Sequence, residues 1–181
     1  KKTVDPEIRE DLNIMKQNTE RLLSLTNQLL DFRKTESQGF RLNFAECNVT
    51  EVLKETYNRF TSLARQRELD FVLNIGEQDF YAHVNKEAFT KIVSNLLNNA
   101  VKYAETYVHV FLEMNGIGEK RMFYIRTVND GVIIPNEMKE EIFKPFVRFN
   151  EKEDGKVTTG TGIGLALSRS LAELHQGSLM M

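Results

Sequence analysis

The stretch Val157-Thr-Thr-Gly160-Thr-Gly162-Ile-Gly164-Leu165 places three glycines at alternate positions, directly before a helical pattern of apolar residues. Glycine adopts backbone conformations that other residues avoid, and it lets a ligand approach the main chain closely. The unpaired N–H groups and the positive dipole end of the following helix favour an anion such as phosphate. No Gly-Lys-Ser/Thr follows and no strand leads directly into the stretch, so it is neither a Walker loop nor a dinucleotide fingerprint. It predicts a phosphate-binding helix start, and a glycine-rich helix start without a ligand is the alternative.

A second polar pattern, Asn95-Leu-Leu-Asn-Asn99-Ala-Val-Lys102-Tyr103, lies on a strongly periodic helix that Asn85 is expected to cap. Asn95 and Asn99 are four residues apart and share one helix face, with Lys102 close by. Asparagine is a mediocre helix former, so local propensity does not explain three of them within five residues. Amide oxygens suit Mg²⁺, which takes one or two protein ligands and completes its shell with phosphate and water. A solvated polar face is the alternative.

A third pattern, Asn129-Asp130-Gly131-Val-Ile-Ile134-Pro135, follows a strand-like run. A carboxylate or amide oxygen at this point is able to accept a hydrogen bond from the amino group of adenine. The adjacent glycine is then expected to leave room for the flat ring. An ordinary Asn-Asp-Gly turn is the alternative.

The composition is that of an ordinary globular protein, since 41% of the 181 residues are hydrophobic and 28% are charged. The net charge of −2, with both signs mixed along the chain, excludes a basic stripe, so nucleic acid is not an expected partner. The single cysteine cannot form an internal disulfide, and zinc-ligand spacing is absent. No apolar run approaches the roughly 18 residues that cross a bilayer, so any membrane anchor is expected outside this segment.

Helical and strand-like patterns indicate the fold class. Alternating apolar residues predict strands at 40–44, 69–75, 80–84, 107–114 and 121–128, the last two forming a hairpin around Asn115-Gly116-Ile117-Gly118. Asn48 is expected to cap a helix, a short helix follows Pro135 as far as Phe143, and a last helix begins near Gly162. This order predicts an α+β two-layer sandwich, with a mixed, mostly antiparallel sheet and helices on one face.

A long helix precedes this sandwich. Its apolar residues recur at three- and four-residue steps from Pro6 to about Thr35. A helix of about 30 residues is about 45 Å long, more than a small domain needs for its own core. We therefore expect it to pack in a helix bundle, and a surface helix lying on its own domain is the alternative.

The three polar patterns, in this order and spacing, resemble the histidine kinase branch of the gyrase, chaperone, mismatch-repair and histidine kinase (GHKL) ATPase superfamily. The likeness runs from about Phe40 to the C-terminus. Its four motifs are the N box, the first glycine box, the F box and the second glycine box, at 95–103, 129–135, 142–146 and 160–164. Residues 18–36, with Gln28-Leu-Leu-Asp-Phe32, resemble the second helix of the family's dimerisation and phosphotransfer hairpin. The first glycine box resembles that of hybrid sensors from gut-type Bacteroidetes.

This resemblance implies the superfamily's Bergerat ATP-binding fold at 39–181, after the hairpin helix at 1–38, with ATP and Mg²⁺ as cofactors. It implies that Asn95 and Asn99 hold Mg²⁺ and that Asn95 and Lys102 act in catalysis. The charged stretch 144–159 resembles the lid over ATP, anchored near Phe143, Phe146 and Phe149. The residues implied in nucleotide binding are Asn95, Asn99, Lys102, Tyr103, Asn129, Asp130, Gly131, Ile134, Phe146, Thr159, Gly160, Thr161, Gly162, Ile163, Gly164 and Leu165.

Three departures from the family pattern qualify this expectation. Asn129 stands where the family has the adenine-contacting Asp, and Ile133 replaces the second glycine. A neutral acceptor is weaker than an ionised one, so we expect ATP binding to lose about 1 kcal/mol, under tenfold in affinity, unless Asp130 shifts into the role.

The family's phosphoacceptor histidine is missing, because the three histidines, His83, His109 and His175, all lie in the ATPase region. The sequence also ends at Met181, where the family continues with a hairpin of strands, so the core is expected to be either incomplete or completed by residues outside this sequence.

The sequence therefore predicts the catalytic domain of a two-component sensor protein-histidine kinase, which transfers the γ-phosphate of ATP to a His on the dimerisation helix and then to a response regulator. A second copy of the chain and a receiver domain are the expected partners. The expected location is the cytoplasmic side of an inner-membrane sensor. A nucleotide-sensing module without turnover is one alternative. A hydrolysing ATPase is another, weakened because Asn95 stands where those relatives carry a general-base Glu.

Overall fold

The computed structural model describes residues 6–37, 41–116, 121–149 and 160–181. Its regular elements follow one another in the order α1 (Pro6–Glu36), β1 (Ala45–Asn48), α2 (Val49–Gln66), β2 (Asp70–Ile75), β3 (Tyr81–Val84), α3 (Lys86–Tyr103), β4 (Tyr107–Asn115), β5 (Met122–Asn129) and α4 (Gly164–Leu174). Two short 3₁₀ turns, Asn136–Met138 and Glu141–Phe143, lie between β5 and α4.

The larger sheet contains β2, β4 and β5, with β4 in the middle. β4 pairs in parallel with β2, with Tyr107 opposite Asp70, and antiparallel with β5, with Val108 opposite Asn129. The parallel pair is possible because β3 and α3 lie between β2 and β4 in the chain and supply the long crossover that parallel strands need. β1 and β3 form a separate antiparallel pair. The predicted mixed, mostly antiparallel pairing is confirmed.

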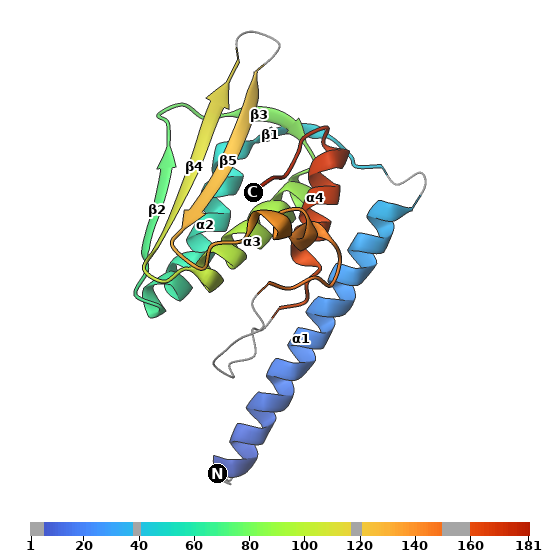
Figure 1. The fold of residues 1–181 in the computed structure, drawn as a ribbon, viewed down its shortest axis with the longest axis vertical. Helices are drawn as coiled ribbons and strands as arrows, with labels where there is room; N and C mark the ends of the chain where they lie inside the picture. Colours follow the sequence, from blue (N-terminus) through green and yellow to red (C-terminus); the bar gives the residue numbers. More distant parts are fainter. Residues whose placement is uncertain (1–5, 38–40, 117–120, 150–159) are drawn as a thin grey trace.

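The helices α2 and α3 cover one face of this sheet, so the domain has two layers (Figure 1). In β4 the inward residues Val108, Val110 and Leu112 are buried and alternate with partly exposed neighbours. This period of two is what a sheet covered on one face requires. Buried residues of α2 and α3, among them Leu53, Val93 and Leu97, complete this core. The predicted α+β sandwich is confirmed.

Asparagines start both helices of this layer, as the sequence predicts. The Asn48 side chain accepts a hydrogen bond from the Glu51 amide at 3.1 Å, and the Asn85 side chain accepts one from the Ala88 amide at 2.9 Å. Each cap satisfies one of the N–H groups that the first turn leaves without a partner. The start of α3, the helix that carries the candidate site, is therefore encoded locally.

The strand predicted at 40–44 is wrong. The described residues 41–44 have no regular structure, and the strand that pairs with β3 begins at Ala45. The alternating apolar residues are used in another way. Leu42 packs against a cluster of Ile163, Leu167 and Leu171, and the Phe44 ring meets the His175 ring edge-on at 5.3 Å. Leu42 and Phe44 thus hold residues 41–44 against α4, because α4 presents a hydrophobic surface there.

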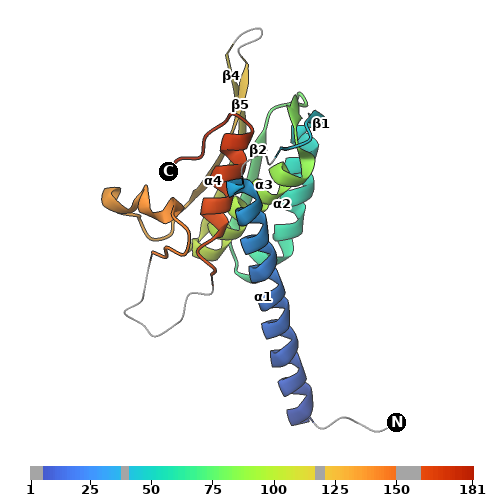
Figure 2. The ribbon, with the colours of Figure 1, turned by 90° about the vertical axis from the view of Figure 1, so that its right-hand side faces the viewer.

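The helix α1 has two different environments along its length. Its C-terminal part packs on α4, while its N-terminal part extends away from the body (Figure 2). Leu12, Met15 and Leu22 are exposed, with 65% of Met15 accessible. Within the described residues the end of the helix lies on its own domain, while its start presents an exposed apolar stripe, and packing in a helix bundle stays a prediction.

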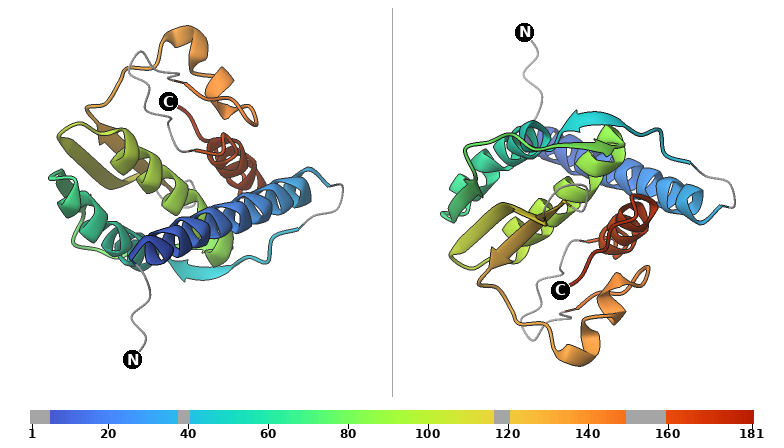
Figure 3. Two further views of the ribbon diagram at one scale, coloured as in Figure 1. Left: turned by 90° about the horizontal axis from the view of Figure 1, so that it is seen from below. Right: turned by 90° about the horizontal axis from the view of Figure 1, so that it is seen from above.

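The segment after β5 forms two 3₁₀ turns where the sequence predicts one short helix ending at Phe143. Viewed along the long axis, this segment and α1 lie on opposite sides of α4 (Figure 3). Phe143 is buried, and the Arg169 guanidinium lies 4.5 Å from the centre of its ring. The F-box segment is thereby held against α4.

No helix in the described ranges is long and apolar enough to cross a membrane.

Candidate functional site

The last three turns of α3 meet both glycine-rich segments. A Cβ atom added at Gly131 would come within 2.0 Å of the Tyr103 carbonyl oxygen, and one at Gly160 within 2.9 Å of the Lys102 ammonium nitrogen. At Gly164, the added atom would lie 3.6 Å from the Asn95 side chain. Residues separated by up to 69 positions in the sequence thus share one site. The structure brings together three patterns that lie apart in the sequence.

The two asparagines that share one face of α3 differ in their contacts. The Asn95 side-chain NH₂ donates to the Gly164 carbonyl at 3.2 Å and to the Ser168 hydroxyl at 3.1 Å. Asn99 is half-buried and has no hydrogen-bond partner within the described residues. Its amide is therefore available to a ligand. Two amide oxygens on one face fit Mg²⁺, whose remaining ligands are phosphate and water.

Lys102 follows on the same side of the helix. Its ammonium group donates to the Tyr103 hydroxyl at 2.8 Å and lies 4.4 Å from the centre of the Tyr103 ring. Its position beside Gly160 places a positive charge at the segment where the sequence predicts phosphates. A lysine stem is flexible, so the charge can follow an anion.

The second glycine box turns sharply at Gly162, where φ is +70°. Here a Cβ atom would also lie 2.7 Å from the backbone of Phe146, whose amide donates to the Gly162 carbonyl at 2.8 Å. Phe146 itself has a positive φ of 68°, and 64% of it is exposed. Only glycine fits at position 162, both for its backbone angle and for this close approach. Phe146 is therefore held to Gly162 through its backbone, while its ring remains on the surface, and its role as an anchor of the lid stays a prediction.

The helix that follows this box starts without a side-chain cap from its N-cap residue, Ile163, which is a buried core residue. The Thr161 hydroxyl accepts from the Ile163 amide at 3.1 Å and donates to the Gln28 side chain of α1 at 2.8 Å. The first N–H groups of α4, including that of Leu165, lack intrahelical partners, as in any helix. They are suited to an anion.

At the end of β5, neighbouring side chains point in opposite directions. Asn129 pairs with Val108, whose side chain faces the helices, so Asn129 shares the face that α3 covers. Asp130 accepts hydrogen bonds from the amides of Glu105, Thr106 and Tyr107 and from the Thr106 hydroxyl. Its carboxylate holds the turn between α3 and β4. A shift of Asp130 into the adenine position would break these bonds.

Gly131 is required by the protein's own backbone. The space beside its Cα is filled by the Tyr103 carbonyl at the end of α3. The sequence pattern predicts that this space admits a flat ring, and the structure gives a different reason for the glycine. After Gly131, Val132 and Ile133 are largely exposed, while Ile134 is half-buried.

We expect Asp130→Asn to lower the melting temperature at pH 7, and the difference from the wild type to shrink as the pH falls from about 5 toward 3. The Thr106 hydroxyl, followed by the backbone amides, holds the pKa of Asp130 well below its ordinary value. A carboxyl whose folded pKa is depressed stabilises the fold above its unfolded pKa of about 3.9, and this stabilisation fades as the pH falls toward the folded pKa.

Circular dichroism melts at several pH values measure this effect. Glu77→Gln is the matched control, because Glu77 is exposed and makes no hydrogen bond or ion pair within the described residues. A difference in melting temperature between wild type and Asp130→Asn that stays constant across this pH range would show that the carboxylate charge is not what holds the turn.

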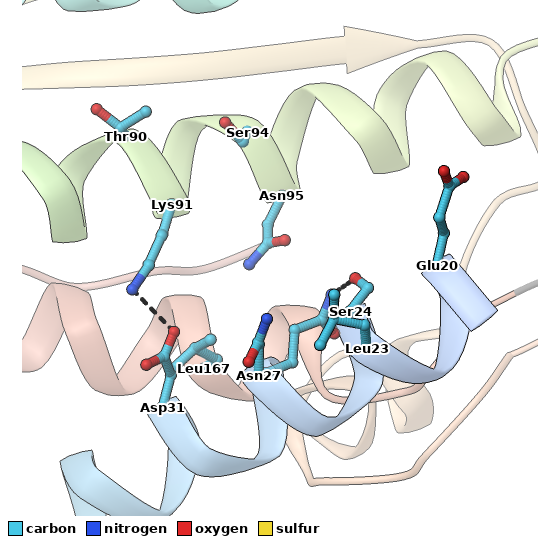
Figure 4. Close-up of a pocket in the computed structure, with 11 residues that line it drawn as sticks. Glu20, Leu23, Ser24, Asn27, Asp31, Thr90, Lys91, Ser94, Asn95 and Leu167 are labelled. Carbon is cyan, nitrogen blue, oxygen red and sulfur yellow. Dashed lines mark hydrogen bonds and ion pairs between the residues drawn. The ribbon is translucent and has the colours of Figure 1, made fainter. Parts of the chain in front are cut away.

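A groove of about 490 Å³ lies between α1 and α3 with α4 as its floor (Figure 4). Its polar lining includes Asp31 of α1, whose carboxylate pairs with Lys91 of α3 at 2.8 Å. Burial opposes the charge of Lys91, but hydrogen bonds with Asp31 and Glu87 raise the pKa of Lys91 overall. Of the candidate site residues in the described ranges, Asn95 lines the groove and the others do not. The groove is therefore beside the candidate nucleotide site and distinct from it.

Sequence reasoning missed several contacts of this region. Ser168, one turn after Gly164 on α4, was identifiable only by the four-residue spacing that puts both on one face. The contacts of Gln28 with Thr161 and of Lys91 with Asp31 gave no signal, because these partners are distant in sequence. His175 accepts from the Asn85 amide at 3.1 Å and thus joins α4 to the start of α3. Thr159 and most of the predicted lid lie outside the described residues.

Comparisons with known proteins show what this chain is similar to. Residues 84–181, more than half of the chain, match the family of histidine kinase-, DNA gyrase B- and HSP90-like ATPases. The sensor histidine kinase WalK of Bacillus subtilis is 26% identical over 168 residues, covering 93% of this chain and 27% of WalK. The chain thus spans about a quarter of the length of that relative.

Solved structures share the fold. Full-length ShkA, crystallised in complex with AMPPNP, superposes with a TM-score of 0.79 at 20% identity, covering 98% of this chain and 37% of ShkA. Histidine kinase ThkA, solved in complex with the response regulator protein TrrA, gives a TM-score of 0.66 at 24% identity, covering 98% of this chain and 48% of ThkA. At these identities the likeness shows the fold, including α1 beside the two-layer domain.

Proposed function

This chain belongs to the histidine kinase-, DNA gyrase B- and HSP90-like ATPase family, and we propose that it is the ATP-binding catalytic part of a two-component sensor protein-histidine kinase. The observation that carries the proposal is the meeting of α3 with both glycine-rich segments, Lys102 beside Gly160 and Asn95 beside Gly164. Family membership supports ATP as the ligand. The sensor histidine kinases among the relatives support the kinase branch.

In the proposed site each segment has a separate task. Asn95 and Asn99 would hold Mg²⁺, which neutralises the charge on the phosphates when bound. Lys102 and the N-terminal amides of α4 would bind the phosphates. Asn129 would accept from the adenine amino group, with Ile134 and the exposed Phe146 near the nucleotide. Phosphoryl transfer depends on such positioning and charge neutralisation more than on covalent chemistry by the protein.

The exposed part of α1 supports a separate role for residues 1–38 as the second helix of a dimerisation and phosphotransfer hairpin. Leu12, Met15 and Leu22 form an apolar stripe that solvent reaches in the chain by itself. An apolar helix face is stable when other helices cover it. We propose that these helices are the first helix of the hairpin and the same helices of a second copy, and that the phosphorylated histidine lies on that first helix.

Partners and location follow as further parts of the proposal. ThkA was solved with a response regulator, which supports a receiver domain as the next acceptor of the phosphate. Mg²⁺ and the homodimer rest on the site chemistry and on the apolar stripe. We place the domain on the cytoplasmic side of a membrane sensor. The Bacteroidetes origin stays a prediction.

A phosphotransfer assay tests the function. The hairpin with its histidine is supplied as a separate polypeptide, together with labelled ATP and Mg²⁺. The expected result is acid-labile phosphate on the hairpin. ATP binding without label would favour the nucleotide-sensing module, and release of phosphate without label would favour a hydrolase.

We expect Asn129→Ala to weaken ATP binding well beyond Asp130→Ala, and Asn129→Asp to strengthen it by less than tenfold, since a charged acceptor adds about 1 kcal/mol. Asn129 lies on the face that α3 covers, whereas Asp130 is held by the turn after α3. Titration calorimetry at a temperature well below the melting point of each variant measures the affinities. A larger loss for Asp130→Ala would reject the alignment of Asn129 with the adenine.

A further inference from the structure

Ser168 is a polar residue in an apolar position. It lies on α4 between the core residues Leu167 and Leu171, and it is completely buried. A buried hydroxyl is unfavourable unless it has a hydrogen-bond partner. Its partner here is the Asn95 side-chain NH₂, at 3.1 Å. A hydroxyl in the core of α4 is thus used to contact a residue of the candidate nucleotide site.

The second partner of Asn95 determines which way its amide points. The Gly164 carbonyl, at 3.2 Å, has no hydrogen to donate, so the group that faces it must be the NH₂ of Asn95. The Asn95 oxygen is therefore turned away from α4. No donor within the described residues reaches this oxygen. In Figure 4 the nitrogen points toward α4 and the oxygen toward the C-terminal end of α3, where Asn99 and Lys102 follow.

We propose that Ser168 is a positioning residue, which holds the Asn95 amide so that its oxygen faces the Mg²⁺ that accompanies the nucleotide. This inference rests on the proposed function. An amide that rotates by half a turn would present its NH₂ group to the cation, and an NH₂ group is no ligand for Mg²⁺. The Gly164 carbonyl disfavours that rotation, because it can only accept a hydrogen bond. The Ser168 hydroxyl adds a second hydrogen bond to the same NH₂ group and so keeps the amide against α4.

The first test compares four full-length chains: the wild type, Ser168→Ala, Asn95→Asp and the double variant. AMPPNP affinity is measured by calorimetry with EDTA and at increasing Mg²⁺. Ser168→Ala is expected to leave the AMPPNP affinity in EDTA unchanged. It should raise by about three- to fivefold the Mg²⁺ concentration at which half of the Mg²⁺-dependent gain in AMPPNP affinity is reached, because one hydrogen bond is lost. A carboxylate presents an oxygen in either orientation, so in the Asn95→Asp background the same change should have an effect below twofold.

The outcomes separate this inference from the proposed function. A wild-type affinity that does not respond to Mg²⁺ would overturn the Mg²⁺ site itself. A normal Mg²⁺ response in Ser168→Ala would overturn the positioning role alone. An equal loss with and without Mg²⁺ would also overturn it, because it would mean that Ser168 serves only the packing of α4.

A second measurement needs neither nucleotide nor a stable variant. In the free wild-type chain, the side-chain NH₂ protons of Asn95 should exchange with solvent at least about fivefold more slowly than those of Asn98, which is exposed on the same helix. Nuclear magnetic resonance of the two side-chain amides gives both rates. Equal rates would overturn the inference, since the amide of Asn95 would then not be held.

Discussion

Gly131→Ala is expected to lower the free energy of unfolding by about 3 kcal/mol, at the upper end of what overpacking costs. The added methyl group would lie 2.0 Å from the Tyr103 carbonyl oxygen and 2.8 Å from its carbon, and both atoms are backbone. A flexible side chain would move aside, but the end of α3 cannot shift without displacing Lys102 and the turn that Asp130 holds. Chemical denaturation followed by circular dichroism measures the loss.

The chain offers a matched control for this change. Gly76 lies after β2, and a Cβ atom there would meet nothing within 4 Å. Gly76→Ala should therefore change the free energy of unfolding by less than about 0.5 kcal/mol, as is usual for surface positions. Equal stability of the two variants would mean that α3 does not approach β5 as closely as the structure places it.

Asn99→Ala is expected to reduce phosphotransfer to the supplied hairpin by about 100-fold or more while the melting temperature stays the same or rises slightly. Residues that only orient a metal ligand are already worth about 10- to 100-fold in activity, so a ligand should be worth at least as much. Stability should not fall, because Asn99 has no hydrogen-bond partner within the described residues and alanine is the better helix former. Initial rates at saturating ATP and Mg²⁺ measure the effect.

The neighbouring Asn98 provides the control. It has the same side chain on the same helix, but it is exposed, whereas Asn95 and Asn99 are half-buried. Asn98→Ala should transfer phosphate at the wild-type rate. A large loss in Asn98→Ala, or a normal rate in Asn99→Ala, would contradict the assignment of the face. Asn95→Ala should lose both activity and stability, because Asn95 also binds α4.

Much of the fold was predictable because the signals are local. The backbone hydrogen bonds of a helix join residues four apart, so the apolar period and the cap that predict a helix lie within one short stretch of sequence. This is the case for α1 and for the helices that Asn48 and Asn85 begin. The candidate nucleotide motifs could be proposed for the same reason, since each is a short run such as 160–164. The strand at 40–44 was predicted wrongly because alternation shows which residues are buried and does not show against what they are buried.

The sequence by itself therefore determined the four long helices, the strand-like runs from residue 69 onward and the residue types of each motif. Only the tertiary structure decided that β2 pairs in parallel with β4, that Gly131 is needed because of the Tyr103 carbonyl, and that Ser168 holds Asn95. The physical reason is that these contacts join residues far apart in the chain. Which residues meet in these contacts depends on the packing of α3 against β5 and α4, and no short stretch of sequence predicts that packing.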